Sequence, residues 1–293
     1  MRGLELRLNQ TQSIRLEIAL RNVEELHSQS IAKPVVVIGE SIPIQQEDSI
    51  LKGHGTSERD GELVATLCGV VERVNKLVYV RTLRARYKPE VGDIVVGRVL
   101  EVAQKRWKVE INYGQDAFLM LSSMNLPDGI QRRRTAVDEL NMRSVFEEND
   151  VVCAEVRNFH GDGSLQLQAR SQKYGKLGRG QLLTCPPYLV KRQKVHFHHI
   201  EEDGVDLILG CNGFIWAGEH QEDGSTMATR QQICRISNGV RVLSDLGFSL
   251  SLDVIKNVVA LSVTLKLTID QMLDPEFYVS VAESEAERRT KKK

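Results

Sequence analysis

The 293-residue chain has few aromatic residues, no net charge and no long apolar run. Phe, Trp and Tyr make up 5% of it, so a core must be packed mainly from aliphatic side chains. The 39 basic and 39 acidic residues cancel, which excludes a protein that coats nucleic acid through bulk positive charge. No apolar stretch approaches the roughly 18 residues of a membrane span, and the N-terminus lacks the apolar core of a signal peptide. We therefore expect no membrane partner.

Cysteine is also scarce, and its spacing excludes two kinds of site. The chain has five cysteines, an odd number, and the closest two, Cys211 and Cys234, are 23 residues apart. A zinc ribbon needs pairs of closely spaced cysteines, and a disulfide framework needs an even set. We expect reduced, mostly buried thiols in a cytosolic or nuclear protein.

Sequence motifs of catalysis are missing. There is no GxxxxGK[ST] phosphate loop, no HExxH metal helix and no GxSxG nucleophile elbow. His196, His198 and His199 could ligate a metal because residues two apart on a strand share a face, but no further ligand is indicated. The acidic run 201–206 is typical of a loop rather than of the rigid carboxylates of a two-metal nuclease. We therefore expect no catalytic residues, no metal site and no cofactor.

Opposite charges are segregated along the chain. Residues 40–62 have a net charge of −4, and residues 71–110 a net charge of +5. Residues 170–199 hold seven basic residues and no acidic one, whereas residues 200–224 hold seven acidic residues and no basic one. One interpretation is a basic surface for a polyanion. The other is a pair of solvated faces that neutralise each other, and charge alone does not choose between them.

The hydrophobic pattern indicates a mainly β protein with an α+β C-terminal part. Residues 4–28 have the spacing of an amphipathic helix, and residues 35–90 consist of short β-branched runs separated by turn residues. Further helices are predicted over 229–246 and 253–261. The last residues, 283–293, are highly charged, and we expect them to form a disordered tail.

Residues 91–170 have the element order of an OB barrel. Five strands are predicted, with a short helix between the third and the fourth, and this order is typical of the OB fold; the strands span 91–102, 107–112, 117–122, 151–159 and 164–169. Thr135, followed by Asp138, resembles a capping box at the start of the helix. We expect Val137, Leu140 and Val145 to face the barrel core.

Basic residues gather in two loops that such a barrel can place at one end. OB barrels bind single strands through a positive groove and stacking aromatic residues, so these loops are candidates for RNA contact. Together with a later basic segment they give the candidate RNA-binding residues Lys105, Arg106, Trp107, Lys108, Arg132, Arg133, Arg134, Lys191, Arg192 and Lys194. A core position remains open for Trp107, and an interface with an acidic neighbour remains open for the charged residues.

The stretch Gly210-Cys211-Asn212-Gly213 has two interpretations. As a GxxG loop it would clamp phosphates between two helices, as in KH domains. Its flanks, however, are predicted strands, and Asn-Gly between apolar strands is a strong hairpin signal because the type I′ turn needs positive φ twice. We favour a structural turn.

Seven stretches together resemble one known family. They are LKGHGT (51–56), GVVERVNKL (69–77), KRWKVE (105–110), LSSMNLP (121–127), SQKYGKL (171–177), VKRQK (190–194) and GCNGFIW (210–216). Over about residues 34–280 the chain is similar to the eukaryotic RNA exosome cap subunits called ribosomal-RNA-processing protein four. The N-terminal helix resembles a plant-type version.

The resemblance implies a domain order and a function. The expected parts are an N-terminal helical extension, an N-terminal β domain, an S1-like OB domain, a divergent KH-type domain and a charged C-terminal tail, at residues 1–33, 34–88, 89–171, 172–280 and 281–293. It implies a non-catalytic subunit that binds a ring of six RNase PH-like subunits and the other cap subunits. Such a subunit guides single-stranded RNA 3′ ends to an associated 3′-to-5′ exoribonuclease, in nucleus, nucleolus and cytoplasm.

Two features depart from the usual domain patterns. S1-like domains carry stacking aromatic residues in the first hairpin, where this chain has Lys105 and Lys108, so we expect phosphate contact there. KH domains place GxxG between helices, whereas Gly210–Gly213 lies between predicted strands. An alternative function is a free-standing RNA-binding adaptor in translation or ribosome biogenesis, and an enzyme is a third class.

Overall fold

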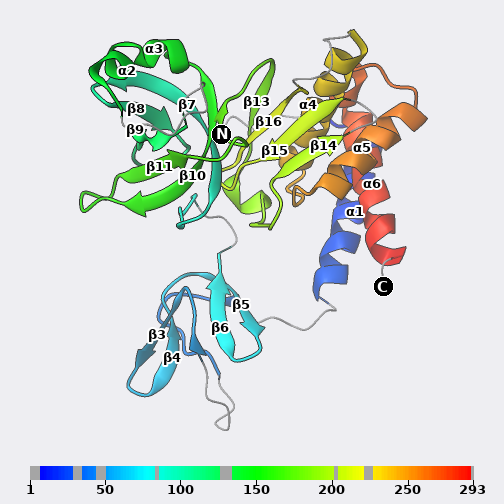
Figure 1. Ribbon diagram of the computed structural model, residues 1–293. Helices are drawn as coiled ribbons and strands as arrows, with labels where there is room; N and C mark the ends of the chain where they lie inside the picture. The colour runs from blue at the N-terminus through cyan, green and yellow to red at the C-terminus, as the bar shows by residue number, and fades with distance from the viewer. Residues whose placement is uncertain are drawn as a thin grey trace. The chain divides into compact units, whose positions relative to one another are not determined.

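The computed structural model describes residues 7–28, 35–43, 51–82, 86–125, 134–200, 204–220 and 227–291 (Figure 1). The chain forms two compact units, which we describe separately. One consists of Met1–Arg7 and Arg86–Val281, and the other of Leu8–Ala85 and Ala282–Lys293. The expected mainly β fold class, with a C-terminal α+β part, is confirmed.

The first unit begins with a closed five-stranded barrel. Its elements are β7 (Ile94–Ala103), β8 (Arg106–Glu110), β9 (Ala117–Met124), α2 (Ala136–Leu140), α3 (Met142–Val145), β10 (Val151–Phe159) and β11 (Leu165–Ala169). The sheet runs β11-β9-β8-β7-β10, and an additional β10–β11 pairing closes it. The element order is that of the OB fold, as the sequence predicts.

Alternating side chains fill the barrel. Along β11 every second residue is buried, and the same alternation holds in β8. The expectation for the helix is wrong in part, because Val137 and Leu140 are exposed and Met142 of α3 is buried instead. The predicted capping contact is present, since the Thr135 backbone N–H donates to an Asp138 carboxylate oxygen at 2.8 Å.

An antiparallel sheet covered by helices completes the first unit. Its elements are β12 (Gly175–Lys176), β13 (Gly180–Thr184), η1 (Pro187–Leu189), β14 (Phe197–Ile200), β15 (Val205–Leu209), β16 (Phe214–Glu219), α4 (Met227–Asp245), α5 (Leu252–Thr264), η2 (Asp270–Leu273) and the first part of α6 (Pro275–Lys291), which belongs to this unit up to Val281. The strand order is β13-β16-β15-β14, with β12 paired to β10 of the barrel. Helix α4 contacts β13, β15 and β16, and Figure 1 shows the helices on one face of the sheet.

The other face of this sheet packs against the barrel. Buried apolar side chains from both sides form one cluster: Val96, Cys153, Ile208, Phe214 and Trp216. Burial raises the pKa of the Cys153 thiol well above its usual value, so this group stays protonated and inert. The barrel and the sheet therefore share a core.

The second unit contains helix α1 (Gln10–Ser28) and a small β structure. A four-stranded sheet has the order β1-β5-β6-β2, and β3 pairs with β4 in a hairpin; the bounds are β1 (Val35–Val36), β2 (Leu51–Lys52), β3 (Thr56–Arg59), β4 (Glu62–Ala65), β5 (Gly69–Val74) and β6 (Leu77–Arg81). Its core is aliphatic, as the scarcity of aromatic residues predicts. Arg15 of α1 pairs with Glu283 of α6 at 2.7 Å.

The predicted disordered tail is instead helical. Helix α6 continues to Lys291. Glu285 is buried and accepts hydrogen bonds from Arg288 and Arg289, one turn further along the helix, at 2.8 and 2.9 Å. Charge of both signs at these spacings supports a helix rather than preventing one. Among the described helices, none combines the length and apolar character that crossing a membrane requires.

Candidate nucleic-acid interface

The turn between β7 and β8 presents the first group of predicted RNA-binding residues. Lys105 occupies the turn with a left-handed backbone, at φ 62°. Its backbone carbonyl accepts a hydrogen bond from the Leu121 N–H at 3.0 Å, which fixes the turn to β9. Its ammonium lies 3.2 Å from a Glu139 carboxylate oxygen, and both side chains are partly exposed. An exposed pair of this kind is weak, so the ammonium remains able to exchange its partner for a phosphate.

The outer face of β8 and β9 continues this basic surface. Arg106 places its guanidinium 4.4 Å from the centre of the Phe118 ring. Lys108 stands opposite Phe118 in the register, and its Nζ is 3.0 Å from an Asp116 carboxylate oxygen. A planar guanidinium on an aromatic ring offers both charge and a stacking surface.

The sequence analysis missed Phe118. Ala117 and Leu119 are buried and Phe118 is half-buried on the outer face. The alternation of β9 carried the signal, since the neighbours of a core position in a strand point outward. Phe118 therefore joins Lys105, Arg106 and Lys108 in what we call the hairpin face.

The assignment of Trp107 to RNA contact is corrected. Its side chain is fully buried, and its indole N–H donates to the Phe146 carbonyl at 3.1 Å. The two rings meet edge to face with centres 5.2 Å apart. Trp107 is thus a core residue of the barrel, and no base can reach it without unpacking the core.

Of the three predicted RNA-binding arginines before α2, the structure describes one. Arg132 and Arg133 lie outside the described residues. Arg134 is half-buried and donates to the Leu121 carbonyl at 3.1 Å and to the Met124 carbonyl. Leu121 thus contacts both Lys105 and Arg134, so these two loops meet at one end of the barrel. Arg134 serves to hold the end of β9 in place, and its contact with RNA stays a prediction.

The later basic segment contains one residue with a different role. Arg192 donates to both carboxylate oxygens of Asp93, at 2.8 and 3.1 Å, and to the Lys88 carbonyl at 2.7 Å. It connects the segment before β14 to the start of β7, and because its side chain is 47% exposed, RNA contact by Arg192 stays a prediction beside this structural role. Lys191 and Lys194 are exposed and stay candidates.

Asp93 is buried at the centre of this contact. Burial by itself would raise the pKa of its carboxyl group. Hydrogen bonds from Arg192, the Glu90 backbone N–H and the Tyr87 hydroxyl outweigh that effect and hold the pKa below its usual value. Burial, and then the neighbouring Asp93 charge, raise the pKa of Tyr87 far above its ordinary value. The carboxylate is therefore ionised and the phenol neutral at neutral pH.

The candidate residues form two groups rather than one. Arg192 binds Asp93 just before β7 begins, whereas Lys105 follows the end of β7. At about 3.3 Å per residue, this ten-residue strand separates the groups by roughly 30 Å. The hairpin face and the pair Lys191 and Lys194 are thus separate contact points.

The stretch Gly210–Gly213 forms the loop of the β15–β16 hairpin. The Gly210 N–H donates to the Phe214 carbonyl at 3.0 Å, and Gly213 alone of the four has positive φ, at 84°. The loop is therefore not the expected type I′ turn, which needs two such residues. A side chain at Gly213 would also meet the Cys185 carbonyl at 2.3 Å, so glycine is required there.

Asn212 anchors this loop to the barrel through hydrogen bonds. Its side chain is fully buried, and its amide donates to the Val96 carbonyl at 2.7 Å and to the Ile111 carbonyl at 2.9 Å. The neighbouring Cys211 N–H donates to the Ile94 carbonyl at 2.9 Å. The N–H groups of Gly210, Cys211 and Gly213 are thus all paired within the protein, whereas a GxxG clamp presents its backbone to phosphates.

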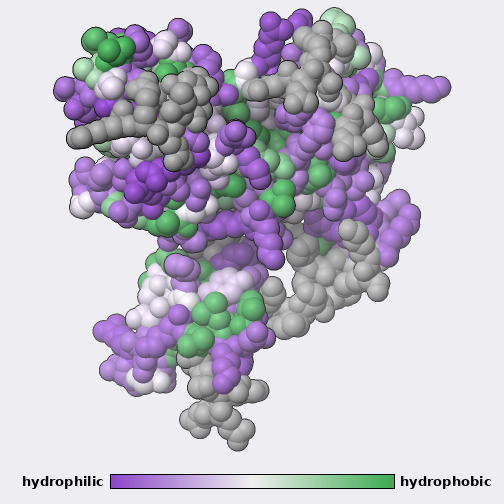
Figure 2. Space-filling model, in the orientation of Figure 1, coloured by the Kyte–Doolittle hydropathy of each residue, from purple (hydrophilic) through white to green (hydrophobic). Residues whose placement is uncertain are grey.

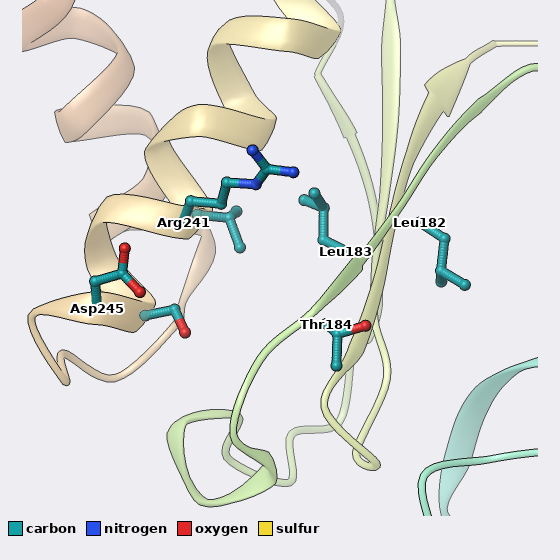
Figure 3. Close-up of a pocket in the computed structure, with 7 residues that line it drawn as sticks. Leu182, Leu183, Thr184, Arg241 and Asp245 are labelled. Carbon is teal, nitrogen blue, oxygen red and sulfur yellow. The ribbon is translucent and has the colours of Figure 1, made fainter. Parts of the chain in front are cut away.

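A pocket of about 280 Å³ lies between β13 and α4. Figure 3 shows Arg241 and Asp245 on the helix, Leu183 and Thr184 on the strand, and Leu182 pointing away from the helix. Asp245 accepts a hydrogen bond from the Tyr278 hydroxyl at 2.9 Å. The lining contains neither histidine nor cysteine, so it resembles a packing groove rather than a site with an activated nucleophile.

Known proteins with similar sequences place this arrangement in a family. Residues 86–158 match the family model described as "RRP4, S1 domain", and residues 180–223 match a model described as "KH domain". The chain is 61% identical to "Exosome complex component RRP4 homolog" of Arabidopsis thaliana, over 100% of this chain and 99% of that protein. It is 46% identical to "Exosome complex component RRP4" of Bos taurus, over 77% and 80%. It is 43% identical to the protein of that name in Saccharomyces cerevisiae, over 68% and 55%. With such identity across its whole length, the chain belongs to the RRP4 family of exosome complex components.

Proposed function

We propose that this chain is a non-catalytic cap subunit of an RNA exosome that binds RNA and guides its 3′ ends into the complex for processing and decay. Relatives with 61% and 46% identity are named exosome complex components. The observation that carries the RNA-binding part is the hairpin face, where basic side chains surround an outward-facing aromatic ring on an OB barrel. Such a face binds single strands with little sequence preference.

The hairpin face supports electrostatic capture rather than base reading. Lys105 and Lys108 are held only by exposed ion pairs, and Arg106 is oriented by Phe118. Phosphate contacts release counterions, so affinity falls with salt by a slope of about 0.7 per contact for single strands. We expect RNA to cross this face with its backbone against the cations and individual bases able to stack on Phe118.

A charge-matched pair of variants tests this role. Replacing Lys105, Arg106 and Lys108 by alanine should weaken binding of a single-stranded RNA by the reconstituted complex. It should also lower the salt slope by about 2, because up to three phosphate contacts are lost. Fluorescence anisotropy at several salt concentrations measures both quantities. The control replaces Arg230, Arg241 and Lys256 on α4 and α5 by alanine, which removes the same charge elsewhere.

The two variants separate the possible outcomes. Equal losses in both would mean that only overall charge matters and would refute a role for the hairpin face. Loss of assembly by the hairpin variant, with the isolated chain still folded by circular dichroism, would assign these residues to a protein interface. Co-purification of the wild-type chain with other exosome components in equal amounts distinguishes a cap subunit from a free-standing adaptor.

The partners in the complex belong to the same proposal. We place the chain on a ring of RNase PH-like subunits, beside other cap subunits and upstream of a 3′-to-5′ exoribonuclease. Exposed apolar side chains support protein neighbours: Leu140 of α2 is 84% exposed, and Leu51, Val74 and Leu77 lie near one another in register on β2, β5 and β6. Figure 2 shows apolar surface over β5 and β6. We also propose localisation in nucleus, nucleolus and cytoplasm, which imaging of a tagged chain would test.

A further inference from the structure

Two histidines and an aspartate meet on the sheet of the first unit, away from the hairpin face. The Nδ1 atoms of His199 and His220 lie 2.7 and 2.8 Å from the two carboxylate oxygens of Asp206. The two imidazole rings are tilted by 48° to each other, with centres 4.4 Å apart. One ligand atom from each residue lies within 4.8 Å of the others. The ligand atoms of the three side chains are thus close enough to share one ion.

The register of three strands brings these residues together. His199 of β14 pairs with Asp206 of β15, which pairs with Gly218 of β16. His220 follows Gly218 by two residues and shares its face. Its backbone N–H donates to the Gly204 carbonyl at 3.2 Å, which holds the end of β16 beside β15.

The hydrogen bonds fix the tautomers of the two rings. An ionised carboxylate only accepts hydrogen bonds, so each imidazole donates from Nδ1. Two partly exposed rings held on one carboxylate contribute little to stability, since exposed pairs of this type are weak. Neither ring takes part in the barrel core or in the hairpin face.

We propose that His199, Asp206 and His220 bind a divalent transition-metal ion such as Zn²⁺. The metal takes the place of the two Nδ1 protons, which move to the Nε2 atoms as the tautomers switch, so that two neutral imidazoles and one carboxylate coordinate it. This donor set suits Zn²⁺, Cu²⁺ or Ni²⁺ and is poorly suited to Mg²⁺, which prefers oxygen ligands.

The geometry is close to that of a three-ligand site. Zinc–nitrogen and zinc–oxygen bonds of about 2.0–2.2 Å put tetrahedral ligands roughly 3.3 Å apart, so the present N···O distances must open by about half an ångström. Rotation of the partly exposed rings can supply that change. Water would complete the coordination, and the ion would connect the ends of β14, β15 and β16.

The charge of the sequence segment that carries Asp206 and His220 favours a cation over a phosphate. Residues 200–224 carry seven acidic and no basic side chains, and Asp206 itself supplies one negative charge. A phosphate would be repelled here, whereas a metal ion would be attracted. Because this segment is acidic, it is not a candidate for RNA contact. The metal proposal therefore does not depend on the RNA contacts of the proposed function.

Zinc titration of the full-length chain tests the proposal. After treatment with EDTA and dialysis, the wild type should bind one Zn²⁺ saturably by isothermal titration calorimetry. His199→Ala, His220→Ala and Asp206→Asn should each lower the affinity at least about tenfold, because a direct ligand matters at least as much as an outer-shell partner. Mg²⁺ should give no comparable heat.

Controls distinguish this site from adventitious binding. His160→Ala removes an exposed histidine of the barrel and should leave zinc affinity unchanged. Circular dichroism without metal checks that each variant is folded. Zinc binding by the three cluster variants as tight as that of the wild type, or no binding by the wild type above the background of a triple variant, would overturn the proposal.

Discussion

Asp93 shows how a single residue connects two parts of the first unit. Its carboxylate accepts from the Tyr87 hydroxyl at 2.9 Å and from Arg192, which lies 99 residues later in the chain. One oxygen also accepts from the Glu90 backbone N–H at 3.0 Å. The side chain is 5% exposed, whereas that of Arg192 is 47% exposed, so solvent weakens the ion pair from one side only.

The depressed pKa of Asp93 predicts a loss of stability in acid. A carboxyl group with a lower pKa in the folded state contributes stability above its unfolded value, about 3.9, and loses it as the pH falls through the folded value. Asp93→Asn should lower the free energy of unfolding at neutral pH by about 1–3 kcal/mol. It should also flatten the fall in stability below about pH 4, where the unfolded carboxyl group becomes protonated first. Urea unfolding followed by tryptophan fluorescence measures this, since Trp107 and Trp216 are both in the first unit.

An exposed carboxylate serves as the control for this prediction. Asp270→Asn removes the same charge from η2 at an exposed position and should change the free energy of unfolding by less than about 0.5 kcal/mol. If Asp93→Asn kept the pH dependence of the wild type, the Asp93–Arg192 contact would not be the acid-sensitive element.

At the scale of elements, the β15–β16 hairpin acts as a connector between sheet and barrel. Asn212 donates twice and accepts once from the Val96 N–H at 3.4 Å, and its carbonyl accepts from the Asn112 side chain at 2.9 Å. The loop thus supplies hydrogen bonds to barrel backbone that would otherwise be buried without partners. We therefore expect the GxxG-like stretch here to have a structural role rather than a binding one.

Asn212→Ala should therefore destabilise the first unit without a specific effect on RNA. Each buried carbonyl left without a donor costs about 1–3 kcal/mol, and two lose their donor. We expect a loss of at least about 2 kcal/mol in urea unfolding, with RNA affinity unchanged where the variant is folded. Asn112→Ala, which removes one bond from an exposed residue, should cost less.

The opposite outcome would restore the phosphate-clamp interpretation. If Asn212→Ala kept the stability of the wild type but lost RNA affinity, the loop would contact the nucleic acid directly. Anisotropy and urea unfolding on the same protein samples decide between the two.

Helix α6 shows that composition alone does not predict whether a segment forms a helix. Its last two turns are rich in charge and lack an apolar stripe that extends to the end, so the sequence analysis predicts disorder. The structure instead pairs buried Glu285 with Arg288 and Arg289. Burial by itself would raise the pKa of Glu285, and the two arginines lower it overall. Helical spacing of opposite charges, rather than their number, carried the signal.

At the scale of the whole molecule, a net charge of zero conceals separate surfaces. Basic side chains of the hairpin face lie on and beside β8 and β9, whereas the acidic sequence segment 200–224 includes Asp206 of β15. The net charge is zero because positive and negative segments cancel in the sum. The net charge therefore gives no sign of either segment.

The purified chain should leave RNA intact. The pocket between β13 and α4 has neither histidine nor cysteine in its lining, and a relative with 61% identity is named as a component of the exosome complex. Incubation of a labelled single strand with the chain and Mg²⁺ should show no shortened products on a denaturing gel, whereas the complete exosome should shorten it. Products that persist across independent preparations and disappear in a point variant of this chain would refute a non-catalytic role.

Much of the fold follows from local patterns. The period-two alternation of β8 and β11 and the order of strands about one helix determine an OB barrel, because each strand must bury one face. The same alternation places Phe118 on the outer face of β9, although Phe118 was not among the residues predicted to contact RNA. The alternation could not decide whether Trp107 faces the core or the solvent. An aromatic residue at an alternating position fits a core and a stacking surface equally until the register is known.

The sequence by itself determined the fold class, the family and the basic hairpin, because periodicity and long matching stretches are properties of neighbouring residues. Only the tertiary structure decided that Trp107 is buried, that Arg192 binds Asp93, that Asn212 anchors a hairpin, and that His199, Asp206 and His220 meet. Each of these facts joins residues on separate elements. Contacts of this kind depend on how strands align and how sheets pack, and spacing along the chain does not specify them.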